Sequence, residues 1–185
     1  NTLLGYNTQG PLIGNRNTAI GAGAMQDTDA GSTSGGSNDN IFMGYDAGGG
    51  TWADAACTHN IGIGNYVMDA ALNGALANTA LGYNSLSALT TGDYNTSIGA
   101  HSMTALTTGA ANIGLGVNAL NVHTTGDKNI AIGNNAMYNT DAGSTSLGST
   151  ENIFIGYEAG GGTWADAASN YNVGIGNNVM DAAMN

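Results

Sequence analysis

The chain has 185 residues, including 31 Gly, 1 Pro and 1 Cys, and its formal net charge is -11 with only 2 Lys+Arg. So few cations cannot neutralise a nucleic-acid backbone or bind an anionic membrane surface, which excludes both partners. No stretch approaches the roughly 20 apolar residues of a membrane-spanning helix, so membrane insertion is not expected. The hydrophobic share of 42% depends largely on Ala. The sequence therefore predicts a folded chain with a thin core.

A short unit repeats along the whole chain. It reads Asn, two variable residues, then Ile, Leu or Met, then Gly. It begins at Asn1, Asn17, Asn40, Asn60, Asn78, Asn95, Asn112, Asn129, Asn152 and Asn172. The interval between successive starts is shortest from Asn1 to Asn17 and longest from Asn17 to Asn40 and from Asn129 to Asn152. Such self-similarity is typical of solenoids, so residues 1–185 are predicted to form a single repeat-built segment.

A longer period lies on top of the short one. The sequence GGGTWADAA at 48–56 recurs at 160–168, and DTDAGSTS at 27–34 recurs at the same distance as NTDAGSTS at 139–146. Residues 17–128 thus form one super-repeat, which is duplicated from residue 129 onward. Because the loop lengths recur with the motifs, a block of six units is inferred to have been duplicated.

Each unit predicts one coil of an all-β structure. With the Asn counted as position 1, positions 2 to 4 alternate between larger apolar and small residues, which predicts a short strand. Gly at position 5 predicts a corner with positive φ or no room for a Cβ atom. Positions 8 and 9 predict a second short strand, and TTG at 90–92, 107–109 and 124–126 predicts a turn. The fold class predicted is a parallel β-solenoid or β-roll of about ten coils.

The Asn and Gly residues of the unit are predicted to be structural. Stacked Asn side chains form hydrogen-bonded amide ladders in parallel arrays. The predicted structural positions are Asn17, Gly21, Asn40, Gly44, Asn60, Gly64, Asn78, Gly82, Asn95, Gly99, Asn112, Gly116, Asn129, Gly133, Asn152, Gly156, Asn172 and Gly176.

The thin core also predicts self-association. The larger residues at positions 2 and 4 are expected to face the coil interior. The small residues at position 3 are then expected to let other chains approach closely. A homotrimer is predicted, with a solitary solenoid as the alternative.

The units NTAIG at 17–21, NTALGYNSL at 78–86 and NTSIGAHSM at 95–103 resemble repeats of bacteriophage and other viral tail fibres. They are also similar to the head repeats of trimeric autotransporter adhesins. The resemblance covers all ten units and implies a trimeric extracellular fibre with β-roll segments and a binding role at a host or cell surface. The coils of this chain are longer than those of the adhesins.

Two acidic insertions are candidate calcium sites. The segments 26–39 and 138–151 are rich in Asp, Gly, Ser and Thr, and carboxylate oxygens are the ligands that Ca²⁺ prefers. The candidate ligands are Asp27, Asp29, Asp39, Asp141 and Glu151. The alternative is a pair of solvated turns, and no other metal or cofactor is expected.

Aromatic residues near the GGGTWADAA segments are candidate glycan contacts. A flat aromatic face can cover the apolar side of a pyranose ring. The candidates are Trp52, Trp164, Tyr45 and Tyr157. The alternative is that the Trp residues join Phe42 and Phe154, the Phe residues at position 3 of the same coils, in a locally widened interior or subunit contact.

No catalytic site is predicted. His59, His101 and His123 have no regular relation to the acidic residues and are expected to be exposed. The sequence therefore predicts a structural, non-enzymatic segment of an extracellular tail fibre or adhesin that gives reach and surface attachment. Two alternatives remain: a filament formed by end-to-end stacking, and a glycan-binding module that uses the loop aromatics.

Overall fold

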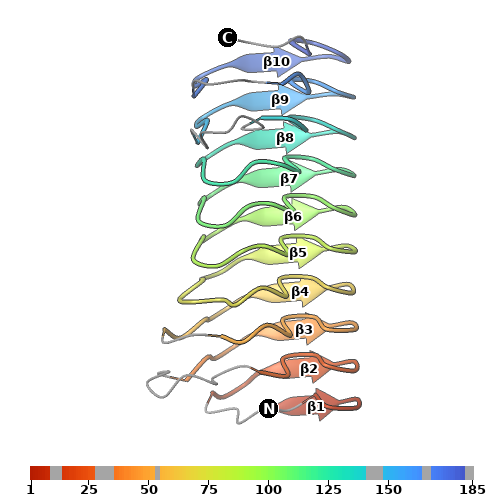
Figure 1. The fold of residues 1–185 in the computed structure, drawn as a ribbon, viewed down its shortest axis with the longest axis vertical. Helices are drawn as coiled ribbons and strands as arrows, with labels where there is room; N and C mark the ends of the chain where they lie inside the picture. Colours follow the sequence, from red (N-terminus) through yellow and green to blue (C-terminus); the bar gives the residue numbers. More distant parts are fainter. Residues whose placement is uncertain (9–13, 28–35, 53–54, 141–147, 164–167, 182–185) are drawn as a thin grey trace.

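The computed structural model describes residues 1–8, 14–27, 36–52, 55–140, 148–163 and 168–181. Ten short parallel strands form one sheet in sequence order, and they stack along the long axis of a rod (Figure 1). The strands are β1 (Thr2–Leu4), β2 (Thr18–Ile20), β3 (Ile41–Met43), β4 (Ile61–Ile63), β5 (Thr79–Leu81), β6 (Thr96–Ile98), β7 (Ile113–Leu115), β8 (Ile130–Ile132), β9 (Ile153–Ile155) and β10 (Val173–Ile175). No helix occurs among the described residues. The predicted parallel β-solenoid is confirmed.

Equivalent positions of the repeat unit stack on one another throughout the sheet. Ala19 pairs with Phe42 across one of the longest coils, and Ala80 pairs with Ser97 across a shorter one. The differences in coil length are therefore absorbed outside the strands. Regular pairing of this kind needs only the invariant Asn-to-Gly segment, which explains how coils of unequal length share one sheet.

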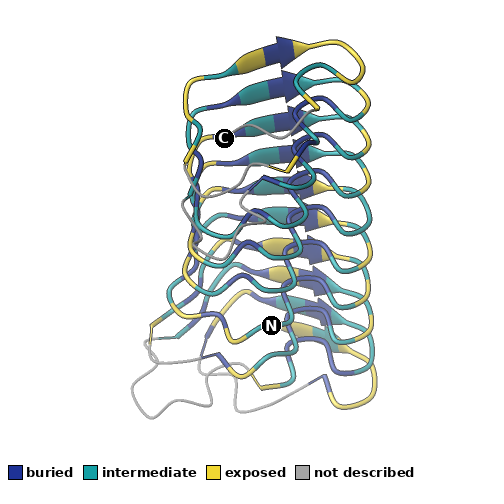
Figure 2. Ribbon diagram, turned by 45° about the horizontal axis from the view of Figure 1, so that its top comes forward, coloured by how far each residue is buried: buried dark blue, intermediate teal, exposed yellow. Residues whose placement is uncertain are grey.

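Position 3, in the middle of each strand, faces the interior of the coil. Ala80 and Ser97 are completely buried, whereas Ile63 and Ile98 at position 4 are 38% and 39% exposed. The strand arrows in Figure 2 carry this alternation. The prediction that positions 2 and 4 face inward, with position 3 at a chain contact, is therefore wrong. The interior is narrow: a Cβ atom added to Gly114 would lie 2.9 Å from Cε of Met103, which reaches in from the opposite wall.

The segment after the corner is a stacked turn and not the predicted second strand. In the β5 coil, Asn84 has φ 58° and Leu86 has φ 52°, both in the left-handed region. Two left-handed residues so close together prevent the extended backbone of a strand. The segment still hydrogen-bonds to the next coil, because the Leu86 N–H donates to the Ser102 carbonyl at 3.1 Å. Side chains such as Leu86 and Leu89 are fully buried here and supply the large residues of the core.

The corner at position 5 admits only Gly. Gly82 has φ +138°, and a Cβ atom there would lie 2.5 Å from the carbonyl oxygen of Gly99 in the next coil. Both the backbone conformation and the close approach of the coils thus require a residue without a side chain.

A large residue at position 3 is accommodated by Gly in the following coil. Phe42 is buried and meets Trp52 edge-on, with ring centroids 5.6 Å apart. A Cβ atom on Gly62, which pairs with Phe42, would lie 2.6 Å from the Phe42 ring. Phe154 and Gly174 repeat this arrangement in β9 and β10.

Candidate functional site

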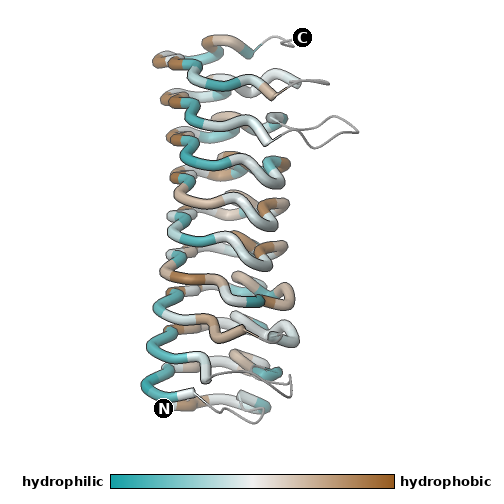
Figure 3. Tube along the Cα trace, turned by 90° about the vertical axis from the view of Figure 1, so that its left-hand side faces the viewer, coloured by the Kyte–Doolittle hydropathy of each residue, from teal (hydrophilic) through white to brown (hydrophobic). Residues whose placement is uncertain are grey.

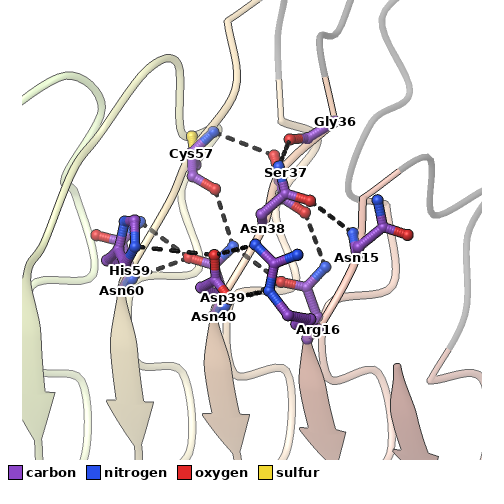
Figure 4. Close-up of polar contacts among 11 residues, drawn as sticks. Asn15, Arg16, Gly36, Ser37, Asn38, Asp39, Asn40, Cys57, His59 and Asn60 are labelled. Carbon is purple, nitrogen blue, oxygen red and sulfur yellow. Dashed lines mark hydrogen bonds and ion pairs between the residues drawn. The ribbon is translucent and has the colours of Figure 1, made fainter.

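The Asn residues that open the coils form a buried ladder. In the β3 coil, Oδ1 of Asn17 accepts hydrogen bonds from the backbone N–H and from Nδ2 of Asn40, at 2.9 and 3.1 Å. The same Nδ2 group donates to the Cys57 carbonyl at 2.8 Å (Figure 4). Each Asn amide thus hydrogen-bonds both to the next Asn along the rod and across its own coil, so the Asn column has a structural role.

Beside the buried ladder lies an exposed column that contains both cations of the sequence. Nε of Arg16 donates to Oδ1 of Asp39 at 2.6 Å, and the second guanidinium contact to Oδ2 is 2.7 Å (Figure 4). One super-repeat later, Nζ of Lys128 lies 3.2 Å from Oε1 of Glu151. The second copy has Lys128 in place of Arg16 and Glu151 in place of Asp39, and the ion pair is kept. The geometry therefore favours a role in aligning neighbouring coils.

The Arg16 side chain controls the ionisation of Asp39. Its hydrogen bond is the main cause that holds the pKa of the Asp39 carboxyl below its ordinary value. Because that pKa is lower in the folded state, the stabilising contribution is present above the unfolded-state pKa and is lost as the pH falls through the folded-state pKa.

In the Arg16→Ala variant, the pKa of Asp39 is expected to rise toward its ordinary value, because the principal hydrogen bond is removed. An NMR titration of the side-chain carboxyl carbon measures this. The Lys128→Ala variant is the control and should leave Asp39 unaffected. An unchanged pKa in Arg16→Ala would show that the ion pair does not form in solution.

The candidate calcium ligands that the structure describes are Asp27, Asp39 and Glu151, and they do not form one site. Asp39 and Glu151 contact cations, and Asp27 is an exposed residue of the turn after β2. Asp29 and Asp141 lie outside the described residues. Among the residues that are described, no three His, Cys, Asp or Glu side chains form a group that could hold a metal ion.

The aromatic candidates divide between the interior and the surface. Trp52 is only 1% exposed and packs against Phe42, so its indole presents no face to a ligand in solution. Its burial matches the alternative in which the Trp joins Phe42 in the interior. Tyr45 and Tyr157 are exposed at position 6 of their coils. Trp164 lies outside the described residues.

The three histidines occupy different environments. His59 is exposed with Nε2 3.8 Å from Oδ2 of Asp39, and His101 is partly buried. His123 is fully buried, so its predicted exposure is wrong. It occupies position 12, where Leu89 and Leu106 fill the core of two earlier coils. Its Nε2 atom lies 3.1 Å from Nδ2 of Asn129, so the ring contacts the Asn ladder.

The outward residues of the strands form a largely apolar surface, here called the outer strand face. It consists of positions 2 and 4 of β1 to β10, where every residue is Ile, Leu, Met, Val or Thr. Its most exposed members in the middle of the rod are Ile41, Ile61, Ile63, Leu81 and Ile98. Hydrophobic segments recur at the same place in successive coils (Figure 3). Parallel sheets are normally covered on both faces, so a face this apolar is typical of an interaction surface.

Four aromatic rings form a second surface feature, the aromatic column, which sequence reasoning missed. Tyr45, Tyr66, Tyr83 and His101 follow the corners of β3, β4, β5 and β6. Neighbouring ring centroids are 5.3, 6.0 and 5.1 Å apart, and each pair meets edge-to-face. The rings alternate between positions 6 and 7, so no single position of the repeat unit reveals them.

These features define the chain as a β-solenoid repeat protein with one apolar outer face. The chain matches no protein-family model, and comparison with curated proteins and with solved structures found no match. The described residues include no helix with the length and apolar character needed to cross a membrane.

Proposed function

We propose that the chain is a non-enzymatic segment of an extracellular fibre, of the tail-fibre or adhesin kind, that assembles as a homotrimer. The observation that carries the proposal is the outer strand face. It supports a different assembly surface from the one expected from the sequence: Ile and Leu at positions 2 and 4 meet the other chains, while position 3 packs inside its own coil.

The physical argument is the one-sided burial of the sheet. With strands about 4.8 Å apart, ten strands make an apolar strip roughly 45 Å long. Association of three such strips around one axis would remove them from water, which is favourable in proportion to the apolar area buried. A rod built in this way resists bending and gives reach. The extracellular location and the attachment role rest on the likeness of the repeat unit to fibre and adhesin repeats.

The proposal predicts that charges on the outer strand face dissociate the assembly. Ile63→Lys with Ile98→Lys is expected to convert a species of three times 18.4 kDa into one of 18.4 kDa, measured by analytical ultracentrifugation. Both side chains point away from the coil interior, so the circular dichroism spectrum should be retained.

A matched control places the same two charges on another exposed surface. Thr91→Lys with Thr108→Lys, in the TTG turns, should leave the trimer intact. A monomeric wild-type chain would contradict the trimer, and equal dissociation by both double variants would show that net charge controls assembly. A ladder of much larger species would support end-to-end stacking into a filament instead.

A further inference from the structure

We propose that the aromatic column is a binding site for a neutral, extended β-1,4-linked glycan that runs parallel to the rod. The inference adds a ligand class and a site to the attachment role, on which it rests, and it does not depend on the oligomeric state. It moves the glycan contact away from Trp52, which is buried, to rings that lie on the surface.

The spacing of the rings carries the first step. Successive coils of a parallel stack are about 4.8 Å apart. An extended β-1,4-linked chain of pyranoses advances by nearly the same distance per sugar. One sugar therefore corresponds to one coil along the column, and the four rings match a stretch of four sugars.

The alternation of the rings carries the second step. Tyr45 and Tyr83, at position 6, are 48% and 50% exposed, whereas the two rings at position 7 are partly buried: Tyr66 lies between Tyr45 and Tyr83, and His101 follows Tyr83. The most exposed rings thus recur every second coil, about 10 Å apart. A β-1,4-linked ribbon turns each sugar over relative to the last, so it presents the same apolar face at every second sugar. Alternate sugars that stack on Tyr45 and Tyr83 would match the two-coil period of the exposed rings to the two-sugar period of the glycan.

The charge and polarity around the column select a neutral ligand. The chain has a net charge of -11, and both cations are held in ion pairs, so an anionic glycan would be repelled. The Asp46 carboxylate raises the pKa of the neighbouring Tyr45 phenol by its charge and by accepting its hydrogen bond, so the phenol stays protonated and its oxygen can accept from a sugar hydroxyl. Nδ2 of Asn84 lies 3.4 Å from Nδ1 of His101, so an amide also borders the rings.

The test uses substitutions that the chain itself carries elsewhere. Asn occupies position 6 at Asn65 and Asn177, and it occupies position 7 at Asn118 and Asn178, the last being the equivalent of Tyr66 one super-repeat later. The variant Tyr45→Asn, Tyr66→Asn, Tyr83→Asn, His101→Asn should therefore fold normally. Tyr94→Ala is the control, because Tyr94 is exposed at the other end of the strands and Ala occupies its position at Ala77 and Ala111.

The binding of cellohexaose, mannohexaose and chitohexaose, all β-1,4-linked, is measured by titration calorimetry on the full chain, with α-1,4-linked maltohexaose for comparison. The wild type is expected to bind at least one β-linked hexamer saturably and maltohexaose more weakly. The fourfold variant should bind that β-linked hexamer at least tenfold more weakly than the wild type does. Tyr94→Ala should bind it as the wild type does. Absence of binding to all three β-linked hexamers, equal binding by the fourfold variant, or equal binding of maltohexaose would overturn the proposal.

Ultracentrifugation of the same samples separates this inference from the fibre proposal. A fourfold variant with the wild-type mass and reduced glycan binding supports the site independently of assembly. A fourfold variant that no longer assembles would instead assign the column to the contact between chains and overturn the glycan site.

Discussion

Asn95→Asp is expected to lower the free energy of unfolding by about 3–5 kcal/mol, the range typical of an uncompensated buried charge. Nδ2 of Asn95 donates to Oδ1 of Asn78 at 3.0 Å and to the Gly109 carbonyl at 2.9 Å. The substitution replaces this shared donor by an oxygen that faces two acceptors inside a fully buried column. Chemical denaturation followed by circular dichroism measures the loss.

The destabilisation by Asn95→Asp should also depend on pH. Protonation of the new carboxyl restores one donor, so the difference from the wild type should shrink as the pH falls and grow as the pH rises. Asn65→Asp is the matched control. Asn65 is exposed, and its Oδ1 only accepts the Tyr45 N–H at 3.0 Å, which a carboxylate also does. A change within about 0.5 kcal/mol is expected there. Equal losses in both variants would contradict a special role for the ladder.

The period of the chain, the strand of each coil and its first corner were predictable because they depend on the backbone. Asn at position 1 and Gly at position 5 recur in every unit, and the structure gives each a backbone reason: the ladder of Asn17 and Asn40, and the close approach of Gly82 to Gly99. Loop length does not disturb these features. The strand and the first corner could therefore be located to the residue.

The orientation of the strand was not predictable from hydrophobicity. A strand of three residues alternates in the same way whichever face is buried, and the rule that large apolar residues lie inside favours Ile63 over Gly62. In the structure the coil is too narrow for the large residues, so Gly62 lies inside and Ile63 lies outside. One signal could have decided it: Phe42 is followed by Gly62 at the same position, and Phe154 by Gly174, as expected where neighbouring side chains compete for one enclosed space.

The turn after the corner had a signal that was missed. Asn recurs at position 7, in Asn7, Asn84, Asn118, Asn135 and Asn178, and Asn is the residue other than Gly that most readily adopts positive φ. This indicates a left-handed residue where an extended segment was expected. The aromatic column had no comparable signal, because its members fall at two different positions and meet only after the coils are stacked.

The pairing of Phe42 with Gly62 predicts a strongly non-additive double-mutant cycle. Phe42→Ala should cost about 3–5 kcal/mol, because it leaves a cavity in the core and removes the contact with Trp52. Gly62→Ala should cost about 1–3 kcal/mol, because its Cβ atom would lie 2.6 Å from the Phe42 ring. In the double variant the added methyl group enters the vacated space, so the second substitution should cost much less than in the wild type, where only the 3.0 Å approach to Cγ1 of Val67 would remain. Denaturant unfolding of the four chains gives the coupling energy directly.

The interior offers a control for this cycle at the same position of another coil. In Gly114→Ala the added Cβ atom would meet Oγ of Ser102 at 2.8 Å and Cε of Met103 at 2.9 Å. These contacts do not involve Phe42, which lies in a distant coil, so the costs of Gly114→Ala and Phe42→Ala should add. Additive costs for Phe42→Ala and Gly62→Ala would show that the ring and the Gly do not share one space. A large coupling would establish that side-chain volume at position 3 is shared between neighbouring coils, so that a coil with Phe requires Gly at the same position of the next coil.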